Sequence, residues 1–372
     1  MGSSETRVVD DPQFQLVNHS AGAGRLPGLD GLRAIAVLLV VLMHFCPSSA
    51  SGSLWDKVVD NGGFGVEVFF VLSGFLITHL LLREEKAAGR ISIRLFYARR
   101  ALRILPPLVL YLAFLYLACM AGAIEVPITD LFAGLLFCRN YVGTSLETGH
   151  LWTLAIEEQF YLLWPITLVL IKSVRFRLLF TAGFVCLSPF WRHLTIRLAS
   201  DPSAINQLRT DLRIEPLAIG ALLALLLSIP LARGFLTRPF IRGLWIAALA
   251  MVFLCAVLLT NTLDVPIMRA FTPTLSWVCV AAIINCSIHD PTDWLTSMLE
   301  LRPLVWLGTL SYSLYLWQQP FAPYVGGGAS PAWFRESPIN LLFAFSLAVF
   351  SFYCVERPIF SLRSRLRQES LP

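Results

Sequence analysis

Long apolar runs constrain the fold of this chain more than any other feature of its sequence. Charged residues make up 14% of the 372 residues, against about 25% in a typical soluble domain. A helix needs about 20 largely apolar residues to cross a bilayer. Ten suitable runs follow one another, at 32–49, 64–82, 104–123, 151–171, 178–191, 214–231, 243–262, 271–288, 304–323 and 339–355. The sequence therefore predicts an all-α, polytopic membrane helix bundle, which excludes an ordinary soluble domain.

The distribution of Lys and Arg predicts how these spans are oriented. With the N-terminus in the cytoplasm, 20 of the 29 Lys and Arg residues fall in cytoplasmic segments and 7 in outer segments, while Arg33 and Arg213 lie at span ends. Because positive charge favours the cytoplasmic side, this asymmetry predicts ten spans with both termini in the cytoplasm. If the short apolar segment 131–142 crossed as well, every later loop would invert. We therefore expect a re-entrant or interfacial helix there.

The same reading predicts one membrane domain with two short tails. Residues 1–26 are expected to form a cytoplasmic tail, 27–358 the membrane domain and 359–372 a basic C-terminal tail. Residues 1–26 are polar and do not look like a cleavable signal, so the first span is expected to direct insertion into the inner (cytoplasmic) membrane. The net charge of +5 is modest and lies on one membrane side, which argues against a nucleic-acid partner. No metal-binding motif is recognised.

Arg33 and His44 lie in the first span, separated by eleven residues. Eleven residues rotate an α-helix by about 20° more than three full turns, so both side chains face one direction. They lie about 16 Å apart along the helix axis. A lone intramembrane His is often a packing residue. Placed above an Arg on the same face, His44 is instead a candidate general base, since imidazole takes up protons near neutral pH. Asp30 is expected to cap this helix and to accept a hydrogen bond from Arg33, and a cap of this kind can also orient a functional arginine.

A basic stretch precedes the third span. Arg100 and Arg103 follow Arg99 in what is expected to be the most basic cytoplasmic loop, and they would be neighbours if that segment were helical. Arginines here can simply mark the cytoplasmic side of the membrane. Alternatively they form a phosphate clamp, because a guanidinium binds phosphate through two parallel hydrogen bonds.

Further ionisable residues are expected at the outer ends of three spans, and one lies at the inner end of the last. Charged groups inside a membrane are costly and usually functional, although an ion-pair network that holds helices together would look the same. Glu356 has a plain alternative role in ending the last helix with a local ion pair. The residues concerned are Glu67, His150, Glu157, Glu158, Arg213, Glu215 and Glu356.

Six sequence blocks together resemble the acyltransferase-3 family of bacterial integral-membrane O-acyltransferases, which modify polysaccharides, lipopolysaccharide and macrolides. The resemblance runs from about residue 26 to 362. The blocks are LDGLRAIAV (29–37), GVEVFFVLSGFLIT (65–78), RRALRILPP (99–107), GHLWTLAIEEQFYLLWP (149–165), LGTLSYSLYLWQQP (307–320) and VERP (355–358).

The resemblance implies transfer of an acyl group, usually acetyl from acetyl-CoA, to a hydroxyl of a carbohydrate or another envelope or secreted acceptor. It implies an essential pair at Arg33 and His44, an R-x-x-R motif at Arg100 and Arg103, and a carboxylate for which Glu356 is the match. Two departures stand out. Many relatives have His-Trp where this chain has Gln318 and Gln319, and many carry a C-terminal esterase-like domain, for which this sequence ends too soon. We therefore expect the chain either to finish the reaction within the membrane domain or to hand over to a separate periplasmic transferase.

The predicted mechanism gives each residue a role. Arg100, Arg103 and Arg33 hold the phosphates of acyl-CoA, a donor substrate and not a permanent cofactor. His44 acts as general base on the acceptor hydroxyl, oriented by a carboxylate such as Glu67 or Glu157. The hydroxyl attacks either the thioester directly or an acyl-enzyme that forms first. Two other functions fit the same residues: a proton-coupled transporter or flippase of an envelope precursor, and a non-catalytic membrane scaffold.

Overall fold

The computed structural model describes residues 26–46, 53–199, 206–238, 243, 266–289, 293–323 and 333–359. This part of the chain is helical and contains no β-strand. Its α-helices are α2 (Leu29–Phe45), α3 (Leu54–Asp60), α4 (Phe64–Ala88), α5 (Ile93–Met120), α6 (Ile128–Leu135), α7 (Leu151–Leu170), α8 (Val174–Leu198), α9 (Thr210–Arg213), α10 (Glu215–Leu227), α11 (Pro230–Leu236), α13 (Pro266–His289), α14 (Trp294–Leu299), α15 (Arg302–Thr309), α16 (Ser311–Trp317) and α17 (Ile339–Phe350). Short 3₁₀ turns lie at Gln319–Phe321 and Trp333–Arg335, and a π-turn follows α17 at Ser351–Glu356.

Five helices in the described ranges are long and apolar enough to cross a membrane: α4, α5, α8, α13 and α17 with its continuation to Ile359. The pair α10 and α11 would make a sixth broken span, because its two parts meet at 109°. The remaining helices of the described ranges are shorter or less apolar. The total of ten spans and the cytoplasmic position of both termini stay predictions. Apart from Gly243, the span expected at 243–262 lies outside the described residues.

Large apolar side chains cover the outside of the bundle. Leu163 on α7, Leu179 and Leu187 on α8 and Leu342 on α17 are each more than 60% exposed. Water would make such a surface prone to association, whereas lipid solvates it without cost. The protein is therefore a multi-pass membrane protein.

The basic stretch before the third span differs from expectation, because it belongs to a helix and not to a loop. α5 begins at Ile93, where the Ser92 hydroxyl accepts a hydrogen bond from the amide N–H of Leu95 at 3.5 Å. Arg99 forms an ion pair with Glu84 at the end of α4, at 2.5 Å. The capped turn and the ion pair let the helix start eleven residues before the apolar run. Arg100 and Arg103 consequently project from a helix, as their spacing allowed.

The short apolar segment at 131–142 does not form a membrane-spanning helix. Its residues belong to α6, which is eight residues long, and to the irregular chain that follows. Phe137 has a positive φ of 54°, which ends the helical path. Eight residues of helix extend about 12 Å, far less than the bilayer core.

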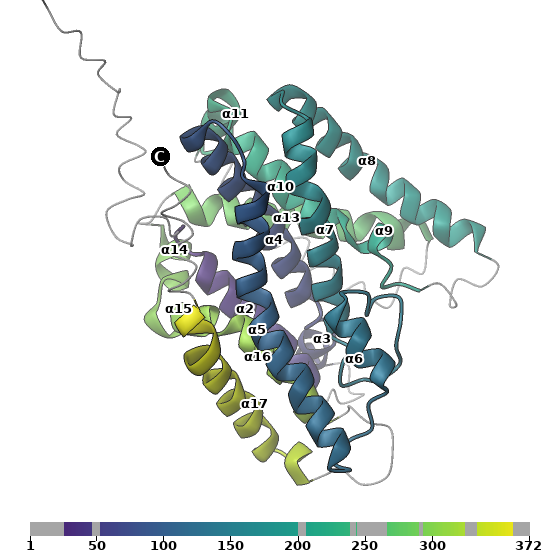
Figure 1. Cartoon of the computed structure of the whole chain (residues 1–372). Coiled ribbons are helices and arrows are strands. Elements are labelled where there is room, and N and C mark those ends of the chain that lie inside the picture. Colours follow the sequence, from purple (N-terminus) through teal and green to yellow (C-terminus); the bar gives the residue numbers. More distant parts are fainter. Residues whose placement is uncertain are drawn as a thin grey trace, which may run out of the picture.

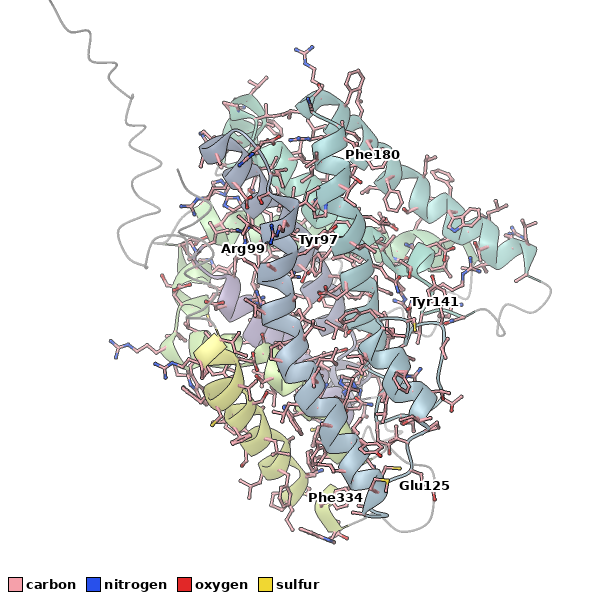
Figure 2. The ribbon with its side chains drawn as sticks, in the orientation of Figure 1. Tyr97, Arg99, Glu125, Tyr141, Phe180 and Phe334 are labelled. Carbon is pink, nitrogen blue, oxygen red and sulfur yellow. The ribbon has the colours of Figure 1, made fainter. Side chains whose placement is uncertain are left out.

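Figure 1 shows α5 running along the bundle, with α8 on one flank and α17 on the other. In Figure 2, Tyr97 and Arg99 lie toward the end of the bundle where α5 begins, and Glu125 and Phe334 lie at the other end. We call these the basic end and the opposite end. α2 and α10 pack against α4, so the polar residues of the first, second and sixth expected spans share one interior.

Two glycines allow α4 and α10 to approach closely. A Cβ atom added to Gly74 would lie 1.9 Å from the carbonyl oxygen of Leu217, and one added to Gly220 would lie 2.0 Å from that of Val71. Neither position has room for any side chain. Small residues at helix crossings are a typical way to pack helices in a membrane, where lipid supplies no hydrophobic drive for association.

We therefore expect Gly220→Val to separate α4 from α10 and to lower stability by about 2 kcal/mol or more, as overpacking does. Gly183→Val on α8 is the matched control, because no atom lies within 4 Å of a Cβ there. Thermal denaturation of the two purified variants in detergent measures the difference. Equal melting temperatures for both variants would contradict the close α4–α10 contact.

Candidate active site

Helix α2 carries the first two candidate residues, Arg33 and His44, near its two ends. The helix begins after Gly28, whose φ of 72° is left-handed and whose amide N–H donates to the Glu300 carboxylate at 2.6 Å. Asp30 lies in the first turn and makes no cap, so the capping role was wrong. Its carboxylate is 3.8 Å from the Arg33 guanidinium. The other expected role, orienting Arg33, fits this geometry.

Three arginines expected to bind phosphate line one internal cavity, which we call the arginine cavity. It has a volume of about 80 Å³ and is bounded by α2, α4, α5, α7 and α16. Arg33 comes from α2 and Arg100 and Arg103 from α5, so residues far apart in sequence meet here. Glu157 from α7 lines the same cavity. Its carboxylate accepts a hydrogen bond from the Ser73 hydroxyl at 2.6 Å.

Arg100 is held by an aromatic ring. Its guanidinium carbon lies 3.7 Å from the ring centre of Tyr161, and its buried Nε has no hydrogen-bond partner among the described residues. Stacking of this kind fixes the plane of a guanidinium and leaves its N–H groups available. One carboxylate oxygen of Glu158 is likewise buried without a partner in the described part of the chain. The arginine cavity thus has three cations and one carboxylate on its wall, and it favours an anion.

His44 lines a second cavity, of about 430 Å³, which we call the histidine cavity. Glu67 from α4 and Arg213 from α9 lie on its wall and form an ion pair at 3.2 Å. The Arg213 guanidinium also lies 5.7 Å from the ring of Trp152. The structure therefore separates the two carboxylates that were candidates to assist His44. Glu67 shares the cavity of His44, and Glu157 belongs to the arginine cavity.

Glu215 belongs to neither cavity and is structural. It is 1% exposed, forms an ion pair with Arg192 of α8 and accepts a hydrogen bond from Thr274 of α13 at 2.7 Å. The ionisable groups expected at the outer ends of three spans are thus divided among three places. The ion-pair network described as the alternative is correct for Glu215.

His150 precedes α7 and lines the histidine cavity together with His44. It is 5% exposed, and neither ring nitrogen has a hydrogen-bond partner among the described residues. The rings of Tyr111 and Tyr315 flank it, with centroid distances of 5.5 and 5.4 Å. The Tyr315 hydroxyl donates to the carbonyl of His150 at 3.0 Å. A buried imidazole that is fixed by packing and lacks partners is available to a ligand.

A buried arginine holds the loop that leads to His150 through hydrogen bonds to its backbone. Arg139 donates hydrogen bonds to the carbonyl oxygens of Val142, Gly143 and Ser145. Asp130 accepts from the amide of Ser145 at 2.6 Å. Sequence reasoning missed Arg139 because it lies in a segment expected only to be interfacial. The sequence signal that could have pointed to Arg139 is its position directly before the stretch 140–149, which is rich in turn-forming residues.

Glu356 is buried, but it neither ends its helix nor lines either cavity. The helical path continues to Ile359, so the terminator role was wrong. Its carboxylate accepts hydrogen bonds from the hydroxyls of Ser313 and Ser351. Of the two glutamines that stand where many relatives have His-Trp, Gln318 takes the place of the imidazole. The amide of its neighbour Gln319 donates to the carbonyl of Leu146 at 2.9 Å and lines the histidine cavity.

The two cavities adjoin each other. Val66, Phe70 and Tyr315 lie on the walls of both. Phe70 packs edge-on against Trp152 at 5.9 Å, and Phe69 packs edge-on against Tyr315 at 6.2 Å. One layer of aromatic and aliphatic side chains therefore separates a site lined by arginine from a site lined by histidine.

Comparison with known proteins bears on this arrangement. The family described as "Acyltransferase domain" matches residues 26–356. The putative peptidoglycan O-acetyltransferase YrhL of Bacillus subtilis is 32% identical over 364 residues, covering 90% of this chain and 55% of YrhL. The peptidoglycan O-acetyltransferase OatA of Listeria monocytogenes is 29% identical over 359 residues, covering 90% of this chain and 56% of OatA.

The O-acetyltransferase OatA of Staphylococcus aureus is 27% identical over 373 residues, covering 94% of this chain and 60% of that protein. The chain thus spans between half and two thirds of the length of these relatives. No solved structure matches it. Because the family match covers most of the sequence, from before α2 to Glu356, the chain belongs to the acyltransferase-3 family and carries an acyltransferase domain.

Proposed function

We propose that this protein transfers an acetyl group from acetyl-CoA to a hydroxyl of a cell-envelope carbohydrate, across the inner membrane. The observation that carries the proposal is the pair of adjoining cavities, one with three arginines and one with His44. The two ends of α2 contribute Arg33 to the first cavity and His44 to the second. Relatives named peptidoglycan O-acetyltransferases support the acetyl group and the class of acceptor. The transporter alternative is not favoured, since the family is one of acyltransferases.

In this proposal the arginine cavity receives the donor from the cytoplasm. Arg33, Arg100 and Arg103 bind phosphate oxygens of CoA through charge-assisted hydrogen bonds. The basic end of the bundle, with Arg99 and the arginines around it, faces the cytoplasm and raises the local concentration of the anionic donor. The acyl-pantetheine arm then points past Phe70 and Tyr315 toward His44. The Glu157 carboxylate offsets part of the positive charge of the three arginines in this cavity.

His44 supplies the proton transfer. Its imidazole takes the proton of the acceptor hydroxyl, whose oxygen attacks the thioester carbonyl carbon. A C–O bond forms and the C–S bond breaks, and the CoA sulfur leaves with the proton that the imidazolium returns. Glu67, with Arg213, shares the cavity and stabilises the imidazolium electrostatically. The hydroxyl belongs either to the carbohydrate or to a separate periplasmic transferase that passes the acetyl group on.

The general-base role predicts that His44→Ala reduces acetyl transfer by about 10²–10⁴-fold, the usual contribution of a positioned base. The measurement is transfer of radiolabelled acetyl from acetyl-CoA to glycan in membrane vesicles. His79→Ala is the matched control, because His79 stacks on Phe75 within α4 and lines neither cavity. Full activity in the His44 variant would remove the central assignment.

The donor site predicts that Arg100→Ala and Arg103→Ala each weaken acetyl-CoA binding by at least about 10-fold, the value of one lost charge-assisted hydrogen bond. Titration of the purified variants with acetyl-CoA measures this. Arg99→Ala serves as the control, since Arg99 is adjacent in sequence but paired with Glu84. An unchanged dissociation constant in all three variants would favour a transporter or a scaffold.

A further inference from the structure

The histidine cavity has more unpaired polar atoms than one proton transfer needs. The indole N–H of Trp277, the amide oxygen of Gln319 and both ring nitrogens of His150 are buried and have no hydrogen-bond partner among the described residues. All three residues line the cavity. Trp277 is 1% exposed and Gln319 and His150 are each 5% exposed. Buried polar groups are rarely left unpaired, and such atoms around a cavity indicate a polar ligand.

Aromatic rings line the same cavity. Trp277 comes from α13, and the guanidinium of Arg192 on α8 lies 4.9 Å from the centre of its ring. Arg192 in turn forms an ion pair with Glu215. Trp152 comes from α7 and packs against Phe70. Tyr315 comes from α16 and packs against the His150 ring. Three elements thus hold rigid aromatic surfaces beside unpaired donors and acceptors.

We propose that the histidine cavity is a binding site for one pyranose ring of the acceptor, and that Trp277 recognises a sugar hydroxyl through its indole N–H. This inference rests on the proposed acetyl transfer and names the part of the acceptor that enters the protein. Gln319 accepts a hydrogen bond from a second hydroxyl. His150 positions the ring so that a third hydroxyl reaches His44.

The mixture of groups identifies a sugar better than any other ligand class. Each sugar hydroxyl both donates and accepts, which matches an indole N–H, an amide oxygen and a neutral imidazole. The apolar C–H faces of a pyranose match aromatic rings. A fatty acyl chain would leave the polar atoms unpaired, at a cost for each one. A phosphate would require a free cation, whereas Arg213 on this wall is paired with Glu67.

The size of the cavity agrees with this assignment. Its volume of about 430 Å³ falls within the 300–1,000 Å³ typical of small-molecule sites. A glycan strand cannot lie inside such a space, so the rest of the acceptor must remain outside the cavity. The site therefore selects a single sugar unit, and in particular one bearing hydroxyls on the side that faces Trp277.

The test measures sugar binding without any donor. The probe is a β-1,4-linked N-acetylglucosamine pentasaccharide, titrated by calorimetry into the purified full chain in nanodiscs. Trp277→Phe keeps an aromatic ring and removes only the N–H group and one ring. Trp294→Phe is the matched control, because Trp294 on α14 is 61% exposed and lines neither cavity. A second variant, Gln319→Leu, removes the unpaired acceptor at similar volume, together with the hydrogen bond to the Leu146 carbonyl.

We expect Trp277→Phe and Gln319→Leu each to raise the dissociation constant of the pentasaccharide about 5-fold, the value of one neutral hydrogen bond. Trp294→Phe should leave it unchanged, and the dissociation constant of acetyl-CoA should not change in any variant. In turnover assays the acceptor KM should rise in the two cavity variants, with kcat within about twofold of wild type.

Two results would overturn the assignment. One is wild-type affinity for the pentasaccharide in both cavity variants. The other is a wild-type chain that binds acetyl-CoA but not the pentasaccharide, which would mean that the acceptor hydroxyl is presented by a different kind of molecule. Failure to bind acetyl-CoA would instead contradict the proposed function, so the two failures are distinguishable. Melting temperatures of the variants separate loss of binding from loss of folding.

Discussion

The cost of placing charge in hydrocarbon is the constraint that governs this structure. An ionisable side chain within a membrane bundle must be paired, satisfied by backbone carbonyls or turned toward a polar cavity. Arg177 illustrates the first two solutions: it is 2% exposed, pairs with Glu85 and donates to the carbonyl of Leu168. Arg192 is satisfied in the same way by Glu215 and Ala270. These arginines are complete without a ligand and serve to fasten helices together.

The residues assigned to function follow the third solution. Arg100 retains an unpaired Nε, and His44 and His150 retain unpaired ring nitrogens within the described part of the chain. Each of these side chains lies on a cavity wall, so the unpaired atoms coincide with space that a ligand can fill. An unpaired buried atom on a cavity wall is therefore the feature that marks Arg100, His44 and His150 as candidates for ligand binding, which residue type alone does not. Glu215 and Glu67 differ in another way: both are paired with an arginine, but only Glu67 faces a cavity.

The sequence predicts features that depend on the geometry of a single helix. It does not predict features that depend on how several helices pack together. The eleven-residue spacing of Arg33 and His44 placed both on one face of α2, and the two residues line adjoining cavities. The same reasoning could not separate Glu67 from Glu157, since that separation depends on how α4 and α7 pack. It could not find Trp277, whose helix α13 is distant in sequence and carries no motif. The start of α5 was missed because Ser92 and the Arg99–Glu84 pair extend the helix beyond its apolar run.

Helix α4 contributes wall residues to both cavities. Glu67, Phe70 and Ser73 succeed one another at intervals of three residues, so they form a stripe along one side of the helix. Glu67 lies on the histidine cavity, Phe70 on the wall common to both cavities, and Ser73 on the arginine cavity. The contact of Gly74 with α10 fixes this stripe relative to the bundle, because no larger residue fits there. A rotation of α4 would move the Glu67 carboxylate, the Phe70 ring and the Ser73 hydroxyl together. The close glycine contact therefore also fixes the order in which these three groups face the two cavities.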